Sequence, residues 1–264
     1  MRIKTVTIDA DVEDVLRAAK LEGNNLYLQG QLSRPLYEKV NKVLSLIGFK
    51  WTSGKVKAHV GQGDSMTKLQ EALGSGKVVD EKQTFQFFET PAQLAARLVS
   101  LADIKPEHAV LEPSAGKGAI VRAIQLSCPK LPVVHAFELN LNMINASPVL
   151  LQENVAVTCL DFLDAKDLQF DRIVMNPPFT GGQDVDHVRH AYKLLRPGGR
   201  LVAIMSKSWL FNSTRKFLAF RAWYEGHQEV GLASTPEEVP AGTFKQSGTE
   251  ISTIIVIILK PSMQ

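Results

Sequence analysis

The sequence has few cysteines and no long hydrophobic segment. Its 264 residues include two cysteines, Cys128 and Cys159, and neither belongs to a CxxC pair or a Cys/His cluster. A disulfide framework or a zinc site is therefore not expected. The most apolar run, residues 251–259, is too short to cross a membrane as a helix. The N-terminal residues carry charges throughout, unlike a signal peptide. We expect an intracellular protein with no metal and no membrane partner.

The sequence also has little excess of positive over negative charge. The formal net charge is only +3, which does not by itself indicate nucleic-acid binding. Hydrophobic residues make up 45% of the chain, enough for a sizeable core, and the length suits one large α/β domain with a small appendage. We predict a small basic α+β module at residues 1–60, a polar linker at 61–84 and an α/β domain at 85–264.

The larger domain shows apolar segments that alternate with helical patterns. Strands are predicted at 109–112, 133–137, 155–159, 172–175 and 201–205, and helices at 119–127 and 184–195. Thr90 is expected to cap a further helix that has Pro91 at its first position and ends before Pro106. Residues 197–199 (Pro-Gly-Gly) predict a turn. This alternation predicts a mostly parallel sheet, in which ligands bind beyond the carboxyl ends of the strands. The polar residues at those ends are Glu112, Glu138, Asp161 and Asn176.

A glycine turn at residues 112–118 follows the first of these strands and opens a helix. By itself it is consistent with a tight strand-to-helix turn that binds nothing. Glu138 lies 22 residues after Gly116, the distance at which an acid binds ribose hydroxyls in nucleotide-binding folds. Asp161 and Phe162 follow one strand later, where an acid and an aromatic can hold an adenine ring. The turn is neither GxGxxG nor a Walker sequence, which disfavours nicotinamide cofactors and ATP.

These three motifs resemble the first three motifs of class I S-adenosylmethionine-dependent methyltransferases. The resemblance implies a Rossmann-like seven-stranded sheet with helices on both faces. It implies that S-adenosylmethionine is bound by Glu112, Pro113, Ser114, Ala115, Gly116 and Gly118, and that Gly116 and Gly118 approach its methionine part. It also implies that Glu138 accepts from the ribose, and that Asp161 and Phe162 meet the adenine. Residues 87–91 resemble the segment that precedes the first helix in amino-methyltransferases, where Phe88 and Thr90 would help hold the methionine end. Core packing is the alternative for the phenylalanines of this segment.

The tetrapeptide Asn176-Pro177-Pro178-Phe179 follows the fourth strand. Alone, it could be a rigid turn, because proline cannot continue a strand ladder. Its chemistry also suits methylation of a planar amine, whose lone pair is delocalised. The Asn176 side-chain oxygen and the Pro177 carbonyl can accept the amine's hydrogens, and successive prolines fix the direction of that carbonyl. Phe179 offers a flat face for a base, and Asn176 also borders the cofactor.

This motif resembles that of adenine-N6 DNA methyltransferases whose cofactor motif comes first in the chain. Residues 197–200, before the fifth strand, support this resemblance, and residues 244–260 are similar to that family's last strands. Such enzymes extrude the target base from a duplex, and Trp209 and Phe211 are candidates for holding it. Core packing is the alternative for either one. Only 85 residues follow Phe179, too few for a separate recognition domain, so sequence recognition would fall to the N-terminal module or to loops 180–186 and 233–248.

The N-terminal module concentrates positive charge. Residues 31–60 contain six basic residues and one acidic residue, a local charge of +5. A helix is predicted from Pro35 to Gly48, followed by a β-hairpin over 49–60. The hairpin residues Lys50, Trp51, Lys55 and Lys57 are candidates for contact with a nucleic-acid backbone, with a solvated surface as the alternative. The segment resembles modules that precede similar methyltransferases in phages and mobile elements.

These observations predict methyl transfer from S-adenosylmethionine to the N6 amine of adenine in DNA, most naturally double-stranded. The protein would be a monomer or a homodimer in the cytoplasm of a bacterium or a phage-infected cell. Asn-Pro-Pro-Phe also occurs in enzymes that methylate RNA amines or a protein glutamine amide, so both acceptors stay open. A non-catalytic DNA-binding or interaction protein that retains the fold is the alternative of another class.

Overall fold

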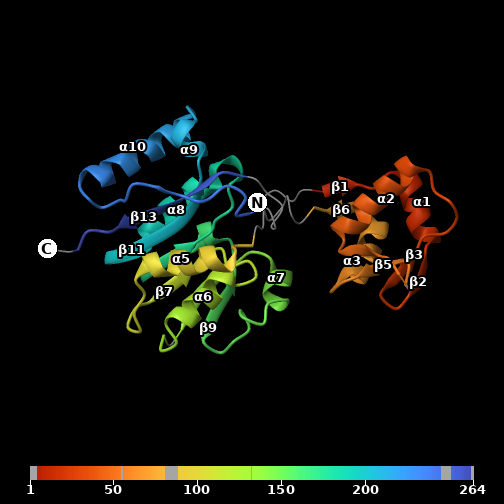
Figure 1. Cartoon of the computed structure of the whole chain (residues 1–264), viewed down its shortest axis with the longest axis horizontal. Coiled ribbons are helices and arrows are strands. Elements are labelled where there is room, and N and C mark those ends of the chain that lie inside the picture. The colour runs from red at the N-terminus through yellow and green to blue at the C-terminus, as the bar shows by residue number, and fades with distance from the viewer. Residues whose placement is uncertain (1–4, 55, 81–88, 132, 245–250, 263–264) are drawn as a thin grey trace. The chain divides into compact units, whose positions relative to one another are not determined.

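The computed structural model describes residues 5–54, 56–80, 89–131, 133–244 and 251–262. The chain divides into two compact units, residues 1–85 and residues 86–264. Figure 1 shows the elements of each unit, which are described separately below. Within the described residues, no helix is both long and apolar enough to cross a membrane.

A seven-stranded sheet forms the centre of residues 86–264. Its order is β12-β13-β11-β10-β7-β8-β9. The strands are β7 (Val110–Glu112), β8 (Val134–Glu138), β9 (Val155–Cys159), β10 (Phe170–Met175), β11 (Leu195–Ser206), β12 (Glu237–Glu238) and β13 (Thr253–Leu259). Strands β7 to β11 run parallel to their neighbours, whereas β13 is antiparallel to both β11 and β12. The carboxyl ends of β7 to β11 therefore meet at one edge of the sheet.

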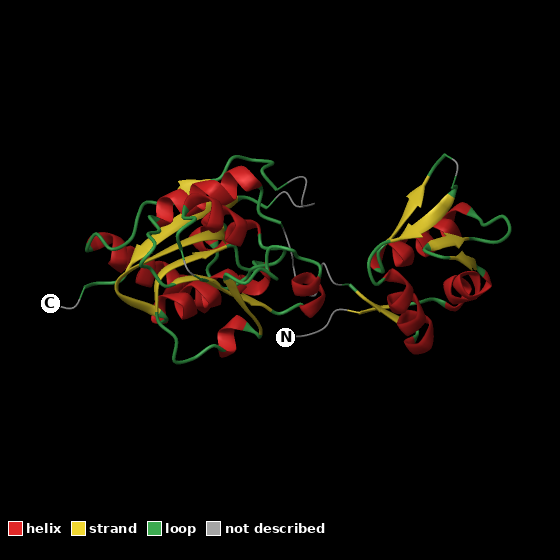
Figure 2. Cartoon of the chain, turned by 90° about the horizontal axis from the view of Figure 1, so that it is seen from below, coloured by secondary structure: helices red, strands yellow, loops and turns green. Residues whose placement is uncertain are grey.

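Helices cover both faces of this sheet, as Figures 1 and 2 show. One face packs against α5 (Ala92–Ala102), α6 (Ala119–Ser127) and α7 (Leu141–Asn145). The other packs against α8 (Gln183–Lys193), α9 (Ser208–Phe211) and α10 (Arg215–Glu229). Successive strand residues point to opposite faces, so Val110 joins the first apolar cluster and Leu111 the second. A short 3-10 helix, η1 (Phe162–Asp164), follows β9, and a second, η2 (Thr180–Gly182), comes between β10 and α8.

The predicted fold class is confirmed: this unit is an α/β domain built on a Rossmann-like seven-stranded sheet. Two local predictions are wrong. Pro91 is the N-cap of α5 rather than its first helical residue, because its ψ of 143° is extended. Residues 197–199 are not a turn between elements. They lie inside β11, beside a register shift between Phe170 and Arg172 of β10.

The N-terminal unit is an α+β fold with a four-stranded antiparallel sheet of order β2-β3-β5-β4. Its elements are β1 (Thr5–Thr7), α1 (Ala10–Ala18), β2 (Lys20–Glu22), β3 (Asn25–Tyr27), α2 (Arg34–Leu46), β4 (Phe49–Thr52), β5 (Ala58–Gly61), α3 (Ser65–Ser75) and β6 (Lys77–Val79). The predicted helix and hairpin are confirmed as α2 and β4–β5. Lys55 lies outside the described residues.

The sequence predicts a linker at residues 61–84, but residues 61–79 belong to the N-terminal unit. Leu69 and Ala72 recur at helical spacing in α3 and are each 2% exposed in the core of this unit. Strand β6 pairs with β1, which brings the two ends of the unit together. The glycines that suggested a linker have a local role, since Gly76 ends α3 in the left-handed conformation.

Candidate functional site

A tight turn connects β7 to α6 at the edge where the parallel strands end. Gly116 (φ 55°) and Gly118 (φ 81°) are both left-handed, a conformation that favours glycine. Gly118 is also the N-cap of α6. A Cβ at this position would lie 3.1 Å from Cγ1 of Val149 and 3.2 Å from Cδ2 of Leu150. Both the backbone conformation and the crowding therefore require glycine at residue 118.

Glu138, at the end of β8, fixes this turn from the neighbouring strand. Its Oε2 accepts from the backbone N–H of Gly116 at 2.7 Å, and its Oε1 accepts from Asn140 N–H at 2.8 Å. Burial raises the pKa of Glu138 above its usual value, while the backbone N–H donors oppose that change. The structure thus brings Glu138 and the glycine turn, 22 residues apart in the sequence, into direct contact.

Glu112 lies beneath the turn and is 2% exposed. Its Oε2 accepts from the backbone N–H of Val121 at 3.0 Å, which ties the end of β7 to the first part of α6. Burial raises the pKa of Glu112 well above its usual value. The Val121 N–H partly opposes this, and the nearby charge of Glu138 adds to it. Glu112 therefore fixes the start of the helix from a position inside the protein.

Two buried polar atoms beside the turn have no hydrogen-bond partner among the described residues. They are Oγ of Ser114 and Nδ2 of Asn140. Asn140 is 4% exposed and caps α7 by accepting from Asn142 N–H at 3.0 Å. Buried polar atoms normally form hydrogen bonds, so two such atoms without partners at neighbouring strand ends suit the binding of a polar ligand. The sequence analysis missed Asn140, although an asparagine between a strand and a helix is a helix-cap signal.

Asp161 and Phe162 follow β9, whose last residue, Cys159, pairs in register with Glu138. The Asp161 side chain caps η1 by accepting from Leu163 N–H at 3.1 Å. Phe162 is 2% exposed, and its ring packs 5.9 Å from the Phe137 ring. Asp161 thus lies at the same edge of the sheet as Glu138, while Phe162 forms part of the core below that edge.

Asn176 follows β10 directly and is hydrogen-bonded to the segment before α5. Its Nδ2 donates to Oγ1 of Thr90 at 3.0 Å, and Thr90 is 6% exposed. This bond joins residues 86 positions apart and fixes which way the Asn176 amide faces. Phe88, the other candidate of the segment before α5, lies outside the described residues.

The remaining residues of the tetrapeptide are packed closely. Pro177 is buried and Pro178 is half-buried. Phe179 is 8% exposed and belongs to the apolar cluster that includes Leu94 and Phe244. Most of its ring is therefore covered in this structure, and only a small part is open for contact with a base.

Of the two aromatic candidates in α9, the structure places only Phe211 at the surface. Trp209 is 1% exposed, and its ring lies edge-on to Phe220 with a centroid distance of 5.1 Å. The core of α9 and α10 covers its faces, so Trp209 is a core residue and not an exposed stacking surface. Phe211 is 79% exposed.

A buried carboxylate that the sequence analysis missed supports this edge of the sheet. Asp184, in the first turn of α8, is fully buried. Its Oδ2 accepts from both the backbone N–H and the hydroxyl of Ser206, each at 2.9 Å. Ser206 ends β11, the strand beside β10. Burial raises the pKa of Asp184, and the Ser206 donors oppose this change. An acid in a first helical turn is common, so no sequence pattern indicated this link.

In the N-terminal unit, the three described candidates lie on or beside the β4–β5 hairpin. Lys50 and Trp51 belong to β4, and Lys57 precedes β5. All three side chains are exposed. The structure places these residues within the N-terminal unit, whereas all the other described candidates belong to residues 86–264.

Comparison with known proteins bears on the larger unit. Residues 93–221 match the Methyltransferase small domain family model. The matched segment contains the glycine turn, Glu138, Asp161 and Asn176. A search of curated proteins finds no match.

Solved structures share the fold. One, from Vibrio vulnificus YJ016, is described as a modification subunit of a type I restriction enzyme. It is 16% identical, with a TM-score of 0.54, over 89% of this chain and 56% of that one. A type I restriction-modification methyltransferase subunit from Streptococcus thermophilus is 18% identical, with a TM-score of 0.52, over 76% of this chain and 50% of that one. The chain therefore spans about half the length of these subunits.

The family model and the fold support a class I methyltransferase, and the cofactor of this fold is S-adenosylmethionine. The residues at the edge fit such a ligand. The glycine turn has no Cβ at Gly116 or Gly118 to keep a ligand away from the backbone, Glu138 supplies a carboxylate, and Ser114 and Asn140 supply buried polar atoms that lack partners among the described residues. Within the same residues, no group of three or more His, Cys, Asp or Glu side chains is placed to hold a metal ion.

Proposed function

We propose that this protein transfers a methyl group from S-adenosylmethionine to the exocyclic N6 amine of adenine in DNA. The observation that carries the proposal is the position of Asn176. It directly follows β10 at the sheet edge that holds the glycine turn, Glu138 and Asp161, and its amide is fixed by Thr90 at 3.0 Å. An amine bound at Asn176 would thus lie beside the cofactor region.

The proposed chemistry follows from the two acceptors at the end of β10. Asn176 uses Nδ2 to bind Thr90, so Oδ1 is the amide atom suited to accept a hydrogen from the substrate amine. The Pro177 carbonyl is the second acceptor, and the following proline restricts its direction. Two acceptors draw the amine away from planarity and make its lone pair more nucleophilic. Orientation supplies much of the remaining rate enhancement. No strong general base is required, because the amine becomes acidic once it is methylated and then loses a proton to water.

The same proposal assigns the cofactor contacts. Gly116 and Gly118 would approach the methionine part, which Thr90 and Phe88 would also help to hold. Glu138 would accept from the ribose hydroxyls, and Asp161 with Phe162 would meet the adenine. The other proposed cofactor-binding residues are Glu112, Pro113, Ser114, Ala115 and Asn176. The cofactor supplies an electrophilic methyl group on a sulfonium. The residues of this chain bind and orient it, and Phe179 would contact the target base through the part of its ring that is not covered.

Nucleic acid is favoured over a protein amide by the charge of the N-terminal unit. Lys50, Trp51 and Lys57 are exposed on one hairpin, which suits an anionic backbone next to bases. An RNA amine or a glutamine amide is the second acceptor class, because the Asn-Pro-Pro chemistry is the same for any planar amine. The proposed substrate is mainly double-stranded DNA, and Phe211 is proposed to contact the target base. The protein is proposed to act in the cytoplasm as a monomer or a homodimer.

The test uses tritiated S-adenosylmethionine with three acceptors: unmodified double-stranded DNA, single-stranded DNA and total RNA. Products are digested and the nucleosides identified by mass spectrometry. We expect N6-methyldeoxyadenosine. Label found only in RNA would instead show that the same active site methylates an RNA amine. Cofactor binding with no label in any acceptor would contradict nucleic-acid methylation and favour the non-catalytic alternative or a protein amide.

A further inference from the structure

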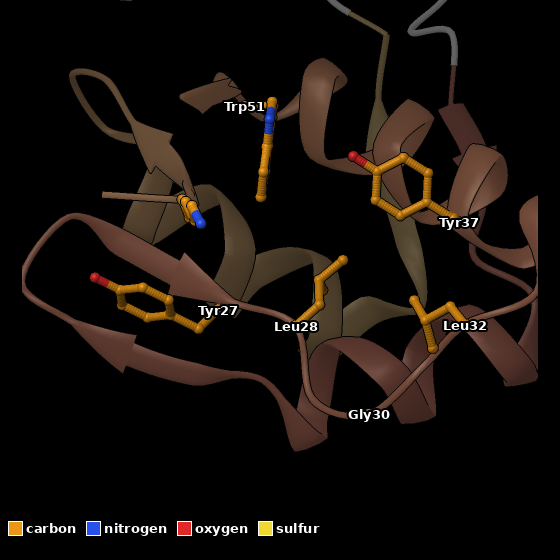
Figure 3. A pocket seen from close by; sticks show the side chains of 7 residues that line it. Tyr27, Leu28, Gly30, Leu32, Tyr37 and Trp51 are labelled. Carbon is orange, nitrogen blue, oxygen red and sulfur yellow. The ribbon is translucent and has the colours of Figure 1, made fainter. Parts of the chain in front are cut away.

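The N-terminal unit contains a pocket of about 240 Å³ at one end of its four-stranded sheet (Figure 3). Its walls come from separate elements: the end of β3, the loop before α2, the first turns of α2, the edge strand β4 and the residue before β5. The side chains that line it are Tyr27, Leu28, Leu32, Tyr37, Trp51 and Lys57. Three aromatic rings, two leucines and one lysine therefore surround a single small space.

The aromatic walls are supported from below by a buried histidine. His59 is fully buried and pairs in register with Trp51 across β4 and β5. Its ring centroid lies 5.1 Å from that of Trp51 and 6.1 Å from that of Tyr37. Burial lowers the pKa of His59, which favours the neutral form of its ring. Trp51 remains 52% exposed, so its ring is supported without being covered.

The view in Figure 3 shows Trp51 edge-on, with the Tyr37 ring on one side of it and the side chains of Leu28 and Leu32 pointing toward the space between them. This arrangement makes an apolar floor between aromatic walls. At 240 Å³ the pocket is smaller than the roughly 300–1,000 Å³ of sites for drug-sized ligands. Its size and shape suit one planar ring system.

Lys57 supplies the charge of this pocket. It adopts a left-handed backbone conformation, with φ at 46°, which is strained for a residue other than glycine. Among the described residues, no acidic side chain forms an ion pair with Lys57, and no acidic residue lines the pocket. A cationic ligand, such as a methylated ammonium group, is therefore disfavoured. A planar ring attached to an anion matches both the walls and the charge.

We propose that this pocket binds one unpaired nucleobase of a DNA strand. Trp51 and Tyr37 would contact the faces or edge of the base, and Lys57 would contact an adjacent phosphate. Aromatic side chains beside a cation are the usual means of holding single-stranded nucleic acid without reading its sequence. The inference rests on the proposed function for the class of substrate, but it requires no methyl transfer. It gives the N-terminal unit a preference for unpaired or distorted DNA.

The experiment measures binding of the full-length protein to a short fluorescent single-stranded DNA, and to the duplex of the same sequence, by fluorescence anisotropy without cofactor. We expect Trp51→Ala to weaken single-strand binding by about tenfold or more. Tyr37→Ala removes the other aromatic wall and should also weaken single-strand binding, whereas Trp51→Phe should retain most of the affinity. Leu21→Ala is the matched control, because Leu21 is 45% exposed on β2, at the opposite edge of the same sheet.

Melting temperatures establish that each variant is folded. If Trp51→Ala does not fold, the Tyr37→Ala and Trp51→Phe pair decides the matter. Unchanged single-strand affinity in folded pocket variants would overturn the inference, as would an equal loss for single strand and duplex. The tritium assay separates this result from the proposed function. If DNA is methylated but the pocket variants keep their single-strand affinity, only the pocket proposal is refuted. If the pocket variants lose single-strand affinity but no DNA is methylated, only the proposed methyl transfer is refuted.

Discussion

The side-chain amide of Asn176 donates to the Thr90 hydroxyl at 3.0 Å, linking the end of β10 to the residue next to the cap of α5. Because Thr90 is 6% exposed, its hydroxyl and the bonded amide are held away from bulk water. A hydrogen bond in that environment is costly to leave unmade, so it specifies the orientation of Asn176. The orientation of the proposed amine acceptor is thus decided by a residue 86 positions earlier.

The first prediction concerns this link. Thr90→Val keeps the shape of the side chain but removes the partner of Asn176 Nδ2, and we expect kcat to fall by at least about tenfold. Thr90→Ser should restore most of the activity because it restores the hydroxyl. Steady-state kinetics and cofactor titration check both variants. A rise in the cofactor Kd with kcat unchanged would instead assign Thr90 to the cofactor alone.

The second prediction separates catalysis from cofactor binding. Asn176→Ala removes the proposed amine acceptor, so we expect turnover to be abolished while S-adenosylmethionine still binds. Thermal unfolding checks the binding, since a ligand at a hundredfold excess over its Kd stabilises a protein by about 2.7 kcal/mol. Equal loss of that stabilisation and of turnover would place Asn176 in the cofactor site rather than at the acceptor.

The third prediction concerns the glycine turn. Gly118→Ala forces an alanine into a left-handed conformation with its Cβ 3.1 Å from Val149, and we expect a loss of stability of more than about 1 kcal/mol. Gly74→Ala, inside α3, is the control, because a Cβ there meets nothing within 4 Å and should be neutral or stabilising. Chemical denaturation measures both. Equal behaviour of the two variants would contradict the requirement for glycine at residue 118.

The fourth prediction uses the buried carboxyl of Glu112. Its folded-state pKa is raised well above the usual value by burial. Between the unfolded and folded pKa values the native state holds a proton that the unfolded chain has lost, so wild-type stability falls as pH rises through that window. Glu112→Gln keeps an oxygen for the Val121 N–H but cannot ionise.

We therefore expect Glu112→Gln to be more stable than the wild type at neutral pH, with the difference shrinking as pH falls toward the usual carboxyl pKa. Denaturation of the cofactor-free protein over a pH series measures it. A stability difference that stays the same at every pH would show that folding does not shift the pKa of Glu112, and it would contradict this prediction.

The fifth prediction concerns the hairpin charges. Lys50→Ala and Lys57→Ala should each weaken DNA binding and reduce the slope of log affinity against log salt by about 1, because each lysine would release counterions from a phosphate. Lys77→Ala, which removes an exposed lysine from β6 of the same unit, should leave the slope unchanged. Equal slopes for all three variants would remove the hairpin from the DNA interface.

The sequence could predict the order and type of the elements because periodicity is a local property. Residues 119–127 and 155–159 match α6 and β9, and the polar residues at the ends of β7 to β10 lie at one edge because parallel strands place them there. The linker prediction failed because burial of Leu69 and pairing of β6 with β1 are long-range events, which polar composition does not reveal.

The sequence by itself determined the α/β class, the glycine turn and the chemistry available at Asn176, since each depends on residue type and local spacing. Only the tertiary structure decided which side chains meet. It buried Trp209 and left Phe211 exposed, although the two lie two residues apart, because one helix face packs on α10 and the other does not. It also bonded Thr90 to Asn176 and Asp184 to Ser206. Contacts of that kind depend on how distant segments pack, which no local pattern encodes.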